Sequence, residues 1–391
     1  MKTERIGITW PLSDRYGWGV FGLNLALQLL ERGGPLPLLL SAPSFGRFPP
    51  GVEERLAPFI KEQKVLLDTV READKHAKLS QALVIHALAN GFRWDTVSDM
   101  ITGRRNVGFI FFEDARFDLD ALKRAQRFDR ILAGSTWNSE VLKAHGLDNV
   151  ARVLQGIDET LFHPRERTAM FGDRFVVFSG GKLELRKGQD TVLAAFKVFR
   201  ETHADALLVT AWHNPWPGTA MDIAQSPHVE GAPDVDDQGA LRIAEWAAAN
   251  GVRAEDFVDV GLIPHEALVQ VMAEADVAVF PNRCEGGTNL VAMETMATGI
   301  PCILSANTGH LDLIAEDTCY PLRRQIPVAS DSGLTEHWRD SQVDEVVAAL
   351  EEVHGDRDEA ARRARAGAEF MKGMTWKHQI GELMETISDL L

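Results

Sequence analysis

Short apolar runs alternate along the chain with stretches in which apolar residues recur at helical spacing. Apolar runs bounded by Gly, Pro, Asn or Asp predict buried strands, and the stretches between them predict crossover helices. The clearest helices are expected at residues 191–200 and 266–274. Strands are expected at residues 5–10, 36–42, 82–88, 107–112, 130–134, 152–155, 175–179, 206–211, 256–261, 277–280 and 301–305. This alternation is typical of βαβ units and parallel sheets, so the predicted fold class is α/β.

The predicted strands form two successive series, which indicates two Rossmann-like domains facing each other across a cleft. A polar stretch at residues 162–174 separates the series, so we place the first domain at 1–165 and the second at 166–374. Residues 212–246 interrupt the alternation and are rich in Pro, Gly, Asp and Trp. This pattern predicts an irregular insertion over the surface, either functional or simply packed.

The most informative segment follows the apolar run 277–280. Two glycines, Gly286 and Gly287, precede an amphipathic stretch, and helix-start amides favour an anion such as a diphosphate. Glu285 lies before the expected helix and Glu294 lies on its second turn. Glycines, helix start and two carboxylates together predict a site for a negatively charged, hydroxyl-rich ligand. A nucleotide sugar fits this description.

Two other glycine-containing loops follow predicted strands. The loop at residues 10–22 contains Gly17 and Gly19, where backbone can approach a ligand, although a tight strand-to-helix turn explains the loop equally well. The loop at residues 180–188 carries Lys182 and Lys187. Fixed cations there would stabilise the negative charge that a departing diphosphate accumulates. Arg186, in the same loop, is expected on the surface.

These segments resemble the retaining glycosyltransferases of family 4, which have the GT-B fold. Residues 294–301 match the second half of the family's donor-site signature. Glu285 and Glu294 are separated by eight residues instead of the family's seven, and glycine best absorbs the extra residue. Lys182 stands where the family usually has arginine, and Lys187 stands where its lysine falls.

The resemblance implies transfer of a sugar from a nucleotide diphosphate sugar to an acceptor hydroxyl, with retention of anomeric configuration. Lys182 and Lys187 would neutralise the diphosphate, Glu285 would orient the sugar, and Glu294 would hold the ribose hydroxyls. A final helix at 375–391 would cross back onto the first domain, and Asp158 would have a structural role. The residues expected to contact the nucleotide sugar besides these are Gly17, Gly19, Ile263, Gly286, Gly287, Thr288, Asn289 and Leu290.

The residues of the first domain that would bind the acceptor are harder to identify from the sequence. Glu113 occupies a place where many relatives carry a histidine near the reacting centre, but it equally fits a helix cap. His86, at the end of the strand 82–88, is a second candidate. The acceptor would be a sugar, a lipid-linked molecule or another hydroxyl compound.

The composition of the chain limits which classes of molecule it is expected to bind. At 391 residues the chain is long enough for two cores, and its net charge of −16 argues against nucleic acid. Three cysteines without metal-ligand spacing, and no secretory segment in Met1–Ile6, predict a cytoplasmic protein. No apolar run approaches the roughly 20 residues that span a bilayer. A basic patch predicts at most peripheral membrane contact, or a solvated helix face: Lys123, Arg124, Arg127 and Arg130.

No metal or other cofactor is expected. Two Asp-x-Asp sequences, at residues 118–120 and 234–236, have the spacing of a metal-binding motif. They fall in a helical stretch and in the insertion, so helix-cap and loop roles are favoured. Two other functions stay open: a non-catalytic GT-B binding or scaffold protein with a degenerate donor site, and a GT-B sugar-nucleotide epimerase or phosphorylase. The oligomeric state, donor base and sugar are open as well.

Overall fold

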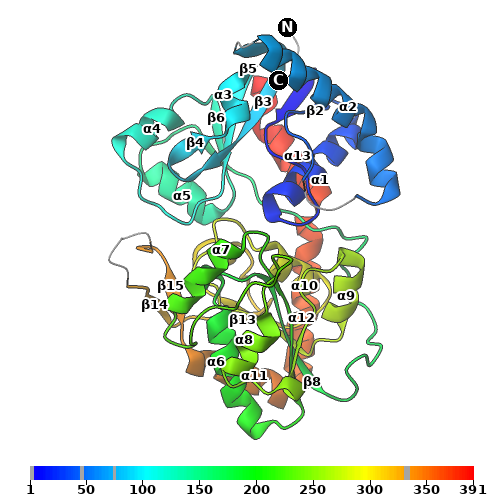
Figure 1. The fold of residues 1–391 in the computed structure, drawn as a ribbon, viewed down its shortest axis with the longest axis vertical. Coiled ribbons are helices and arrows are strands. Elements are labelled where there is room, and N and C mark those ends of the chain that lie inside the picture. The colour runs from blue at the N-terminus through cyan, green and yellow to red at the C-terminus, as the bar shows by residue number, and fades with distance from the viewer. Residues whose placement is uncertain (1–3, 45–47, 74–75, 330–334) are drawn as a thin grey trace. The chain divides into compact units, whose positions relative to one another are not determined.

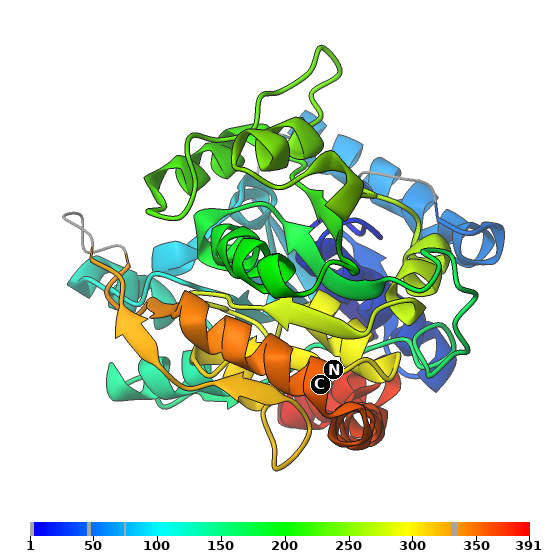
Figure 2. The ribbon, with the colours of Figure 1, turned by 90° about the horizontal axis from the view of Figure 1, so that it is seen from below.

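The structure, a computed structural model, describes residues 4–44, 48–73, 76–329 and 335–391, so the first three residues of the N-terminal segment discussed above lie outside it. Residue contacts divide the chain into two compact units (Figures 1 and 2). Unit 1 comprises Met1–Gly156 and Trp376–Leu391, and unit 2 comprises Ile157–Thr375.

Unit 1 is built on one mixed sheet, which has seven strands within the described ranges. Six run parallel in the order β2-β1-β3-β5-β6-β7, and β4 pairs antiparallel with β3. The strands are β1 (Arg5–Ile8), β2 (Leu36–Leu39), β3 (Ala77–Ala89), β4 (Arg93–Trp94), β5 (Ile101–Ile110), β6 (Arg130–Ala133) and β7 (Val150–Arg152). The helices are α1 (Gly17–Arg32), α2 (Pro50–Ala73), α3 (Thr96–Met100), α4 (Leu119–Ala125), α5 (Thr136–Ala144) and α13 (Trp376–Thr386), with a 3₁₀ turn η1 (Asn90–Phe92).

The last helix of the chain, α13, belongs to unit 1 (Figure 1). Its Trp376 ring meets the Phe21 ring of α1 edge-on at 5.5 Å, and Arg32 donates a hydrogen bond to the Lys377 carbonyl. Ile380 and Leu383 are fully buried. The predicted return of the final helix to the first domain is therefore confirmed.

Unit 2 is a doubly wound sheet of six parallel strands within the described residues, in the order β10-β9-β8-β11-β12-β13. The order reverses between β8 and β11, and such a switch point is where open α/β sheets bind ligands. The strands are β8 (Phe175–Lys182), β9 (Ala206–His213), β10 (Phe257–Asp259), β11 (Val277–Phe280), β12 (Cys302–Ser305) and β13 (Tyr320–Leu322), and an antiparallel pair β14 (Gln325–Pro327) and β15 (Arg339–Ser341) lies outside this sheet.

Helices cover both faces of the unit 2 sheet. On one face, α6 and α11 pack side by side against apolar residues of β8 and β9 (Figure 2). Val291 of α10 approaches Gly180 of β8 so closely that a Cβ there would lie 2.8 Å from it. The helices are α6 (Gln189–Thr202), α7 (Pro217–Ala220), α8 (Ile243–Ala249), α9 (His265–Ala273), α10 (Leu290–Ala297), α11 (Val343–Gly355) and α12 (Arg357–Met371).

The irregular insertion at 212–246 is not confined to the surface. Trp212, Ala220, Ile223 and Trp246 are buried in the same apolar cluster as α6 and β8. Asp222 accepts a hydrogen bond from the Leu185 amide, so the insertion also holds the loop that follows β8.

The observed unit boundary differs slightly from the predicted one at 165/166. Residues 157–165 belong to unit 2, because Ile157 bridges Thr375 and its amide donates to the Met374 carbonyl. Pro164 also packs against Gly299. The polar composition on which the prediction relied marks a surface loop of unit 2, and the change of unit occurs just before it.

Candidate functional site

Two loops of unit 2 meet at the switch point between β8 and β11. The first runs from Lys182 through the 3₁₀ turn η2 (Leu185–Lys187) to the start of α6, and the second runs from Pro281 to the start of α10. Gly188 joins them: its φ is 73°, and a Cβ there would lie 2.3 Å from the Pro281 carbonyl oxygen. Only glycine fits this left-handed, crowded position.

Five charged side chains form a continuous network across these loops. Lys187 Nζ lies 2.5 Å from Glu285 Oε1, and Arg186 lies 3.2 Å from the other oxygen of the same carboxylate. Arg186 also contacts Glu184 at 3.0 Å, and Lys182 contacts Glu184 at 2.6 Å. The network therefore holds three cations and two carboxylates within one strand-end loop and its neighbour.

The network corrects one expectation and adds one residue. Arg186 was expected on the surface, but only 12% of its side chain is exposed, because both Glu184 and Glu285 hold it against the loops. Glu184 was not singled out from the sequence. Its role depends on the fold of a five-residue loop and not on a motif, so only its position between Lys182 and Arg186 hinted at it.

The electrostatics of Glu285 are those of a buried ion pair. Burial alone would raise its pKa, but Lys187 and Arg186 outweigh that effect and lower the pKa of Glu285 to about 2. Burial lowers the pKa of Lys187, although Glu285 opposes this shift. Glu285 is thus an anion at neutral pH, held at the edge where β8 and β11 end.

The loop after β12 holds the backbone of Glu285 through hydrogen bonds. The Glu285 amide donates to Thr308 Oγ1 at 2.8 Å, and the Gly309 amide donates to the Glu285 carbonyl at 3.0 Å. The Asn282 side-chain amide donates to the Glu285 carboxylate. A Cβ at Gly309 would lie 1.7 Å from the Gly287 carbonyl oxygen, so the two loops are in backbone contact.

The start of α10 is held in an unusual conformation. Asn289 has a left-handed φ of 66°, and its side-chain amide nitrogen Nδ2 lies 3.0 Å from His310 Nε2. His310 Nδ1 in turn lies 3.0 Å from Ser305 Oγ, and burial lowers the pKa of His310 to about 4. The first backbone hydrogen bond of the helix runs from the Met293 amide to the Asn289 carbonyl. The backbone amides of the residues before Met293 therefore face away from the helix and can donate to a ligand.

Glu294, on the second turn of α10, contrasts with Glu285. Its side chain is buried, and within the described ranges no hydrogen bond reaches its carboxylate. Burial raises the pKa of Glu294 to about 7. A buried carboxylate without a protein partner is available to hydroxyl groups of a ligand.

The other predicted residues of unit 2 lie at the same carboxyl edge of the sheet. Gly286, Gly287, Thr288 and Leu290 line the turn into α10, between Glu285 and Glu294. Ile263 is half-buried in the loop that follows β10. The structure therefore gathers these residues with Lys182 and Lys187 at the ends of neighbouring parallel strands.

Gly17 and Gly19 belong to unit 1, at the start of α1. Gly17 is exposed, whereas a Cβ at Gly19 would lie 2.4 Å from the Ser13 Cβ. Gly19 therefore lets the loop before α1 pack on the helix. Contact of either glycine with a ligand stays a prediction.

The two acceptor-side candidates differ in their surroundings. His86 is fully buried, with its ring nitrogens 2.9 Å from Ser98 Oγ and 3.0 Å from Asn106 Oδ1, and burial lowers its pKa. These contacts are those of a core histidine, so we leave it out of the proposed site. Glu113 is half-buried in the loop after β5 and does not cap α4, because Asp118 does so through the Ala121 amide.

The remaining sequence features take structural roles. Asp118 caps a helix and Asp236 accepts amide hydrogen bonds within a turn, so both Asp-x-Asp segments have local partners. Asp158 accepts from the Thr160 amide, as expected. In the part of the chain that the structure describes, no group of three metal-ligating side chains and no helix able to cross a membrane is present.

Sequence reasoning missed the buried pair that anchors the second loop. Arg283 is 2% exposed and contacts Asp190 of α6 through two hydrogen bonds of 2.7 and 2.6 Å. Ser226 of the insertion donates to the same carboxylate. No signal in the sequence linked these positions, which lie 93 and 36 residues apart.

The fold and the site together define a class of protein. Two Rossmann-like units, with an anion-compatible site at the switch point of the second and a final helix returned to the first, are the arrangement of the GT-B glycosyltransferases. Comparison with a family model, described as "Family 4 Glycosyltransferase in conflict systems", gives a match over residues 135–383. The chain belongs to this family and is a glycosyltransferase.

Solved structures confirm the fold. Sucrose-phosphate synthase from Thermosynechococcus elongatus aligns with a TM-score of 0.68 and 17% identity over 99% of each chain. HepE from Anabaena, in complex with UDP and glucose, aligns with a TM-score of 0.66 and 12% identity over 99% of each chain. The lipopolysaccharide outer core galactosyltransferase WaaB aligns with a TM-score of 0.59 and 13% identity over 99% of this chain and 100% of that chain. No match was found among curated proteins.

Proposed function

We propose that this glycosyltransferase moves a sugar from a nucleotide diphosphate sugar to an acceptor hydroxyl, with retention of anomeric configuration. The observation that carries the donor part of the proposal is the charge network at the β8–β11 switch point, whereas retention rests on the family resemblance alone. Three cations gathered at the ends of two adjacent strands suit a diphosphate, and Glu285 lies beside them.

Each side chain has a distinct part in the proposed reaction. Lys182, Arg186 and Lys187 stabilise the diphosphate as the bond to the sugar breaks, together with amides at the start of α10. Glu285, fixed as an anion, accepts hydrogen bonds from the sugar hydroxyls and orients the anomeric carbon. Glu294 accepts hydrogen bonds from the ribose hydroxyls.

The resting network sets the energetics of donor binding. Glu184 and Glu285 already hold the three cations, so an entering diphosphate replaces part of those contacts instead of meeting free cations. This arrangement keeps the cations ordered in a buried site and limits the reorganisation needed when charge develops. Because cations serve the diphosphate, the proposed reaction requires no metal.

The first experiment is a thermal-shift panel with UDP, GDP, ADP and dTDP, each with and without EDTA. UDP leads the panel because HepE, which shares this fold, was solved with UDP and glucose. A ligand that binds only the folded protein raises its stability. One strong shift that EDTA does not change is expected. Absence of a shift with every diphosphate would contradict the proposed donor site.

The proposed retention of anomeric configuration needs a separate measurement. Once the nucleotide is known, proton NMR of the first product formed reports its anomeric configuration directly. An α-linked product from an α-linked donor is expected. An inverted product would overturn retention without affecting the assignment of the donor site.

A further inference from the structure

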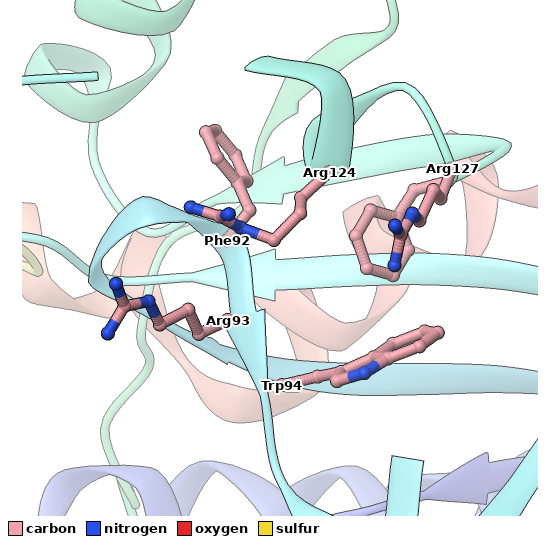
Figure 3. A pocket seen from close by; sticks show the side chains of 6 residues that line it. Phe92, Arg93, Trp94, Arg124 and Arg127 are labelled. Carbon is pink, nitrogen blue, oxygen red and sulfur yellow. The ribbon is translucent and has the colours of Figure 1, made fainter. Parts of the chain in front are cut away.

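Unit 1 contains a pocket that the proposed donor chemistry does not use. Its cavity volume is about 260 Å³ (Figure 3). The lining comes from η1 and β4, from α4, and from the turn before β6: Phe92, Arg93, Trp94, Arg124, Arg127 and Phe128. All six residues belong to unit 1, whereas the donor loops belong to unit 2. An inference about this pocket is therefore independent of the proposed function.

The pocket is rich in guanidinium groups. Figure 3 shows Arg124 and Arg93 reaching to one side of it and Arg127 lying on the other. In the described part of the chain, none of the three forms an ion pair with a carboxylate, although the chain as a whole carries a net charge of −16. Neighbouring cations of the same basic patch behave differently, because Lys123 contacts Asp120 and Arg130 contacts Asp389. Three guanidinium groups that have no carboxylate partner among the described residues favour, at one cavity, an anion with several oxygen acceptors.

The apolar part of the pocket is built from aromatic rings. Phe92 and Phe128 are buried, and the Trp94 ring meets the Phe128 ring edge-on at 5.8 Å with an interplanar angle of 88°. The Trp94 indole N–H donates to Asp99 at 2.7 Å, which fixes the orientation of the ring. The pocket therefore combines a fixed aromatic wall with three arginine side chains.

The backbone at the rim is held in a costly conformation. Gly91 has a φ of 71° and Phe92 has a φ of 57°, which is rare for a bulky residue. Arg124 Nε donates to the Gly91 carbonyl at 2.8 Å and holds this turn. Strain of this kind persists where the surrounding structure enforces it, and here it places the Phe92 ring in the pocket wall.

We propose that this pocket binds an organic phosphate, with the phosphate among the arginine side chains that line it and the organic part against Trp94. Guanidinium groups recognise phosphate by paired hydrogen bonds, and an aromatic wall accepts a ring or an aliphatic stem. The volume lies below that of sites for drug-sized ligands, roughly 300–1,000 Å³, so the bound part is a small phosphate ester or a headgroup. Both sources share the phosphate ester chemistry.

The test is a titration of the full-length protein with phenyl phosphate, inorganic phosphate and phenol. Calorimetry is the measurement. Phenyl phosphate is expected to bind more tightly than inorganic phosphate, and phenol is expected not to bind. The variant Arg93→Gln/Arg127→Gln should weaken phenyl phosphate binding about tenfold or more. Both residues are exposed, so circular dichroism should show an unchanged fold.

The matched control is Lys123→Gln/Lys143→Gln, which removes the same charge from exposed positions of α4 and α5 outside the pocket. It should bind phenyl phosphate as the unaltered protein does. Equal weakening in both double variants would reduce the effect to general charge and overturn the proposal. Equal binding of phenol and phenyl phosphate would overturn it as well.

Vesicles distinguish the source of the phosphate. Phosphatidylcholine vesicles with and without phosphatidic acid are tested for co-sedimentation with the protein. Binding to the acidic vesicles that is lost in Arg93→Gln/Arg127→Gln and kept in the control identifies a lipid headgroup. Binding of phenyl phosphate without vesicle binding identifies a soluble ester. Failure of the phenyl phosphate and vesicle probes to show a dependence on Arg93 and Arg127 would refute the site.

Discussion

At the scale of single residues, the two glutamates of unit 2 show how environment separates chemically identical groups. Glu285 touches Lys187 and Arg186 and has a pKa of about 2, whereas Glu294 has no such partner and has a pKa of about 7. Glu285 is a fixed anion at neutral pH, whereas Glu294 takes up a proton much more readily. Their proposed roles follow this difference: Glu285 would orient the sugar, and Glu294 would accept hydrogen bonds from the ribose hydroxyls.

The raised pKa of Glu294 predicts that this side chain lowers the free energy of unfolding of the ligand-free protein by an amount that depends on pH. Its ordinary value is 4.5, so between about pH 4.5 and 7 the folded state holds a proton that the unfolded state has lost. This group therefore lowers stability as pH rises through that window. Glu294→Gln should raise the free energy of unfolding near pH 8 by up to about 3 kcal/mol and change it little near pH 4.

Urea unfolding at the two pH values checks this prediction. The control is Glu201→Gln, an exposed position of α6, which should stay within about 0.5 kcal/mol at both. A gain from Glu294→Gln that is equal at low and high pH would show that packing, not the charge, is responsible.

Lys187→Ala tests the cation proposed to act on the diphosphate. Arg186 and Asn282 still contact Glu285 in this variant, so we expect the fold to survive. Loss of one group that stabilises developing charge lowers kcat by about 10²–10³. The measurement is turnover of nucleotide sugars that carry the nucleotide identified by thermal shift, with Lys143→Ala as the control. Near-normal turnover in Lys187→Ala would remove this residue from the mechanism.

At the scale of elements, the insertion and α6 act as a brace for the loop before α10. Ser226 holds Asp190, and Asp190 holds the buried Arg283 of that loop. Breaking a buried pair outright costs about 3–5 kcal/mol. Because Asp340 also contacts Arg283 at 2.9 Å, Asp190→Asn leaves that guanidinium with one carboxylate partner and should destabilise unit 2 by part of that amount, about 2–3 kcal/mol, in urea unfolding.

An exposed ion pair provides the comparison for Asp190→Asn. Glu245→Gln breaks the exposed pair with Arg242 and should cost at most about 1 kcal/mol. Similar small losses in both variants would mean that Asp340 alone compensates the charge of Arg283.

The elements themselves were largely predictable, and the network between them was not. Parallel buried strands are continuous apolar runs, so β8, β11 and β12 were located from sequence within a few residues. That Lys187 and Glu285 lie at the same edge of the sheet could be predicted, because each adjoins glycines after a strand. Arg283 and His310 were missed because their partners lie 93 and 21 residues away, and spacing carries no signal for such pairs. Arg186 was misplaced for the same reason.

At the scale of the whole molecule, the chain enters unit 1, builds unit 2 and returns to unit 1 through α13. Ile380→Ala tests how much unit 1 depends on that return. Its side chain is fully buried, and such a truncation costs about 2–5 kcal/mol. Hydrogen exchange should show lost protection in β1, β3 and α1, with the strands of unit 2 unchanged. Leu350→Ala in α11 should give the opposite pattern, and uniform loss in either variant would contradict independent units.

The return of α13 also orders events during synthesis on the ribosome. Unit 2 is complete once Thr375 has emerged, because both of its ends, Ile157 and Thr375, then pair. Unit 1 is made first but still lacks Trp376, Ile380 and Leu383, which cover α1 in the finished protein. The apolar face of α1 that α13 covers in the folded protein therefore stays uncovered while residues 157–375 are translated.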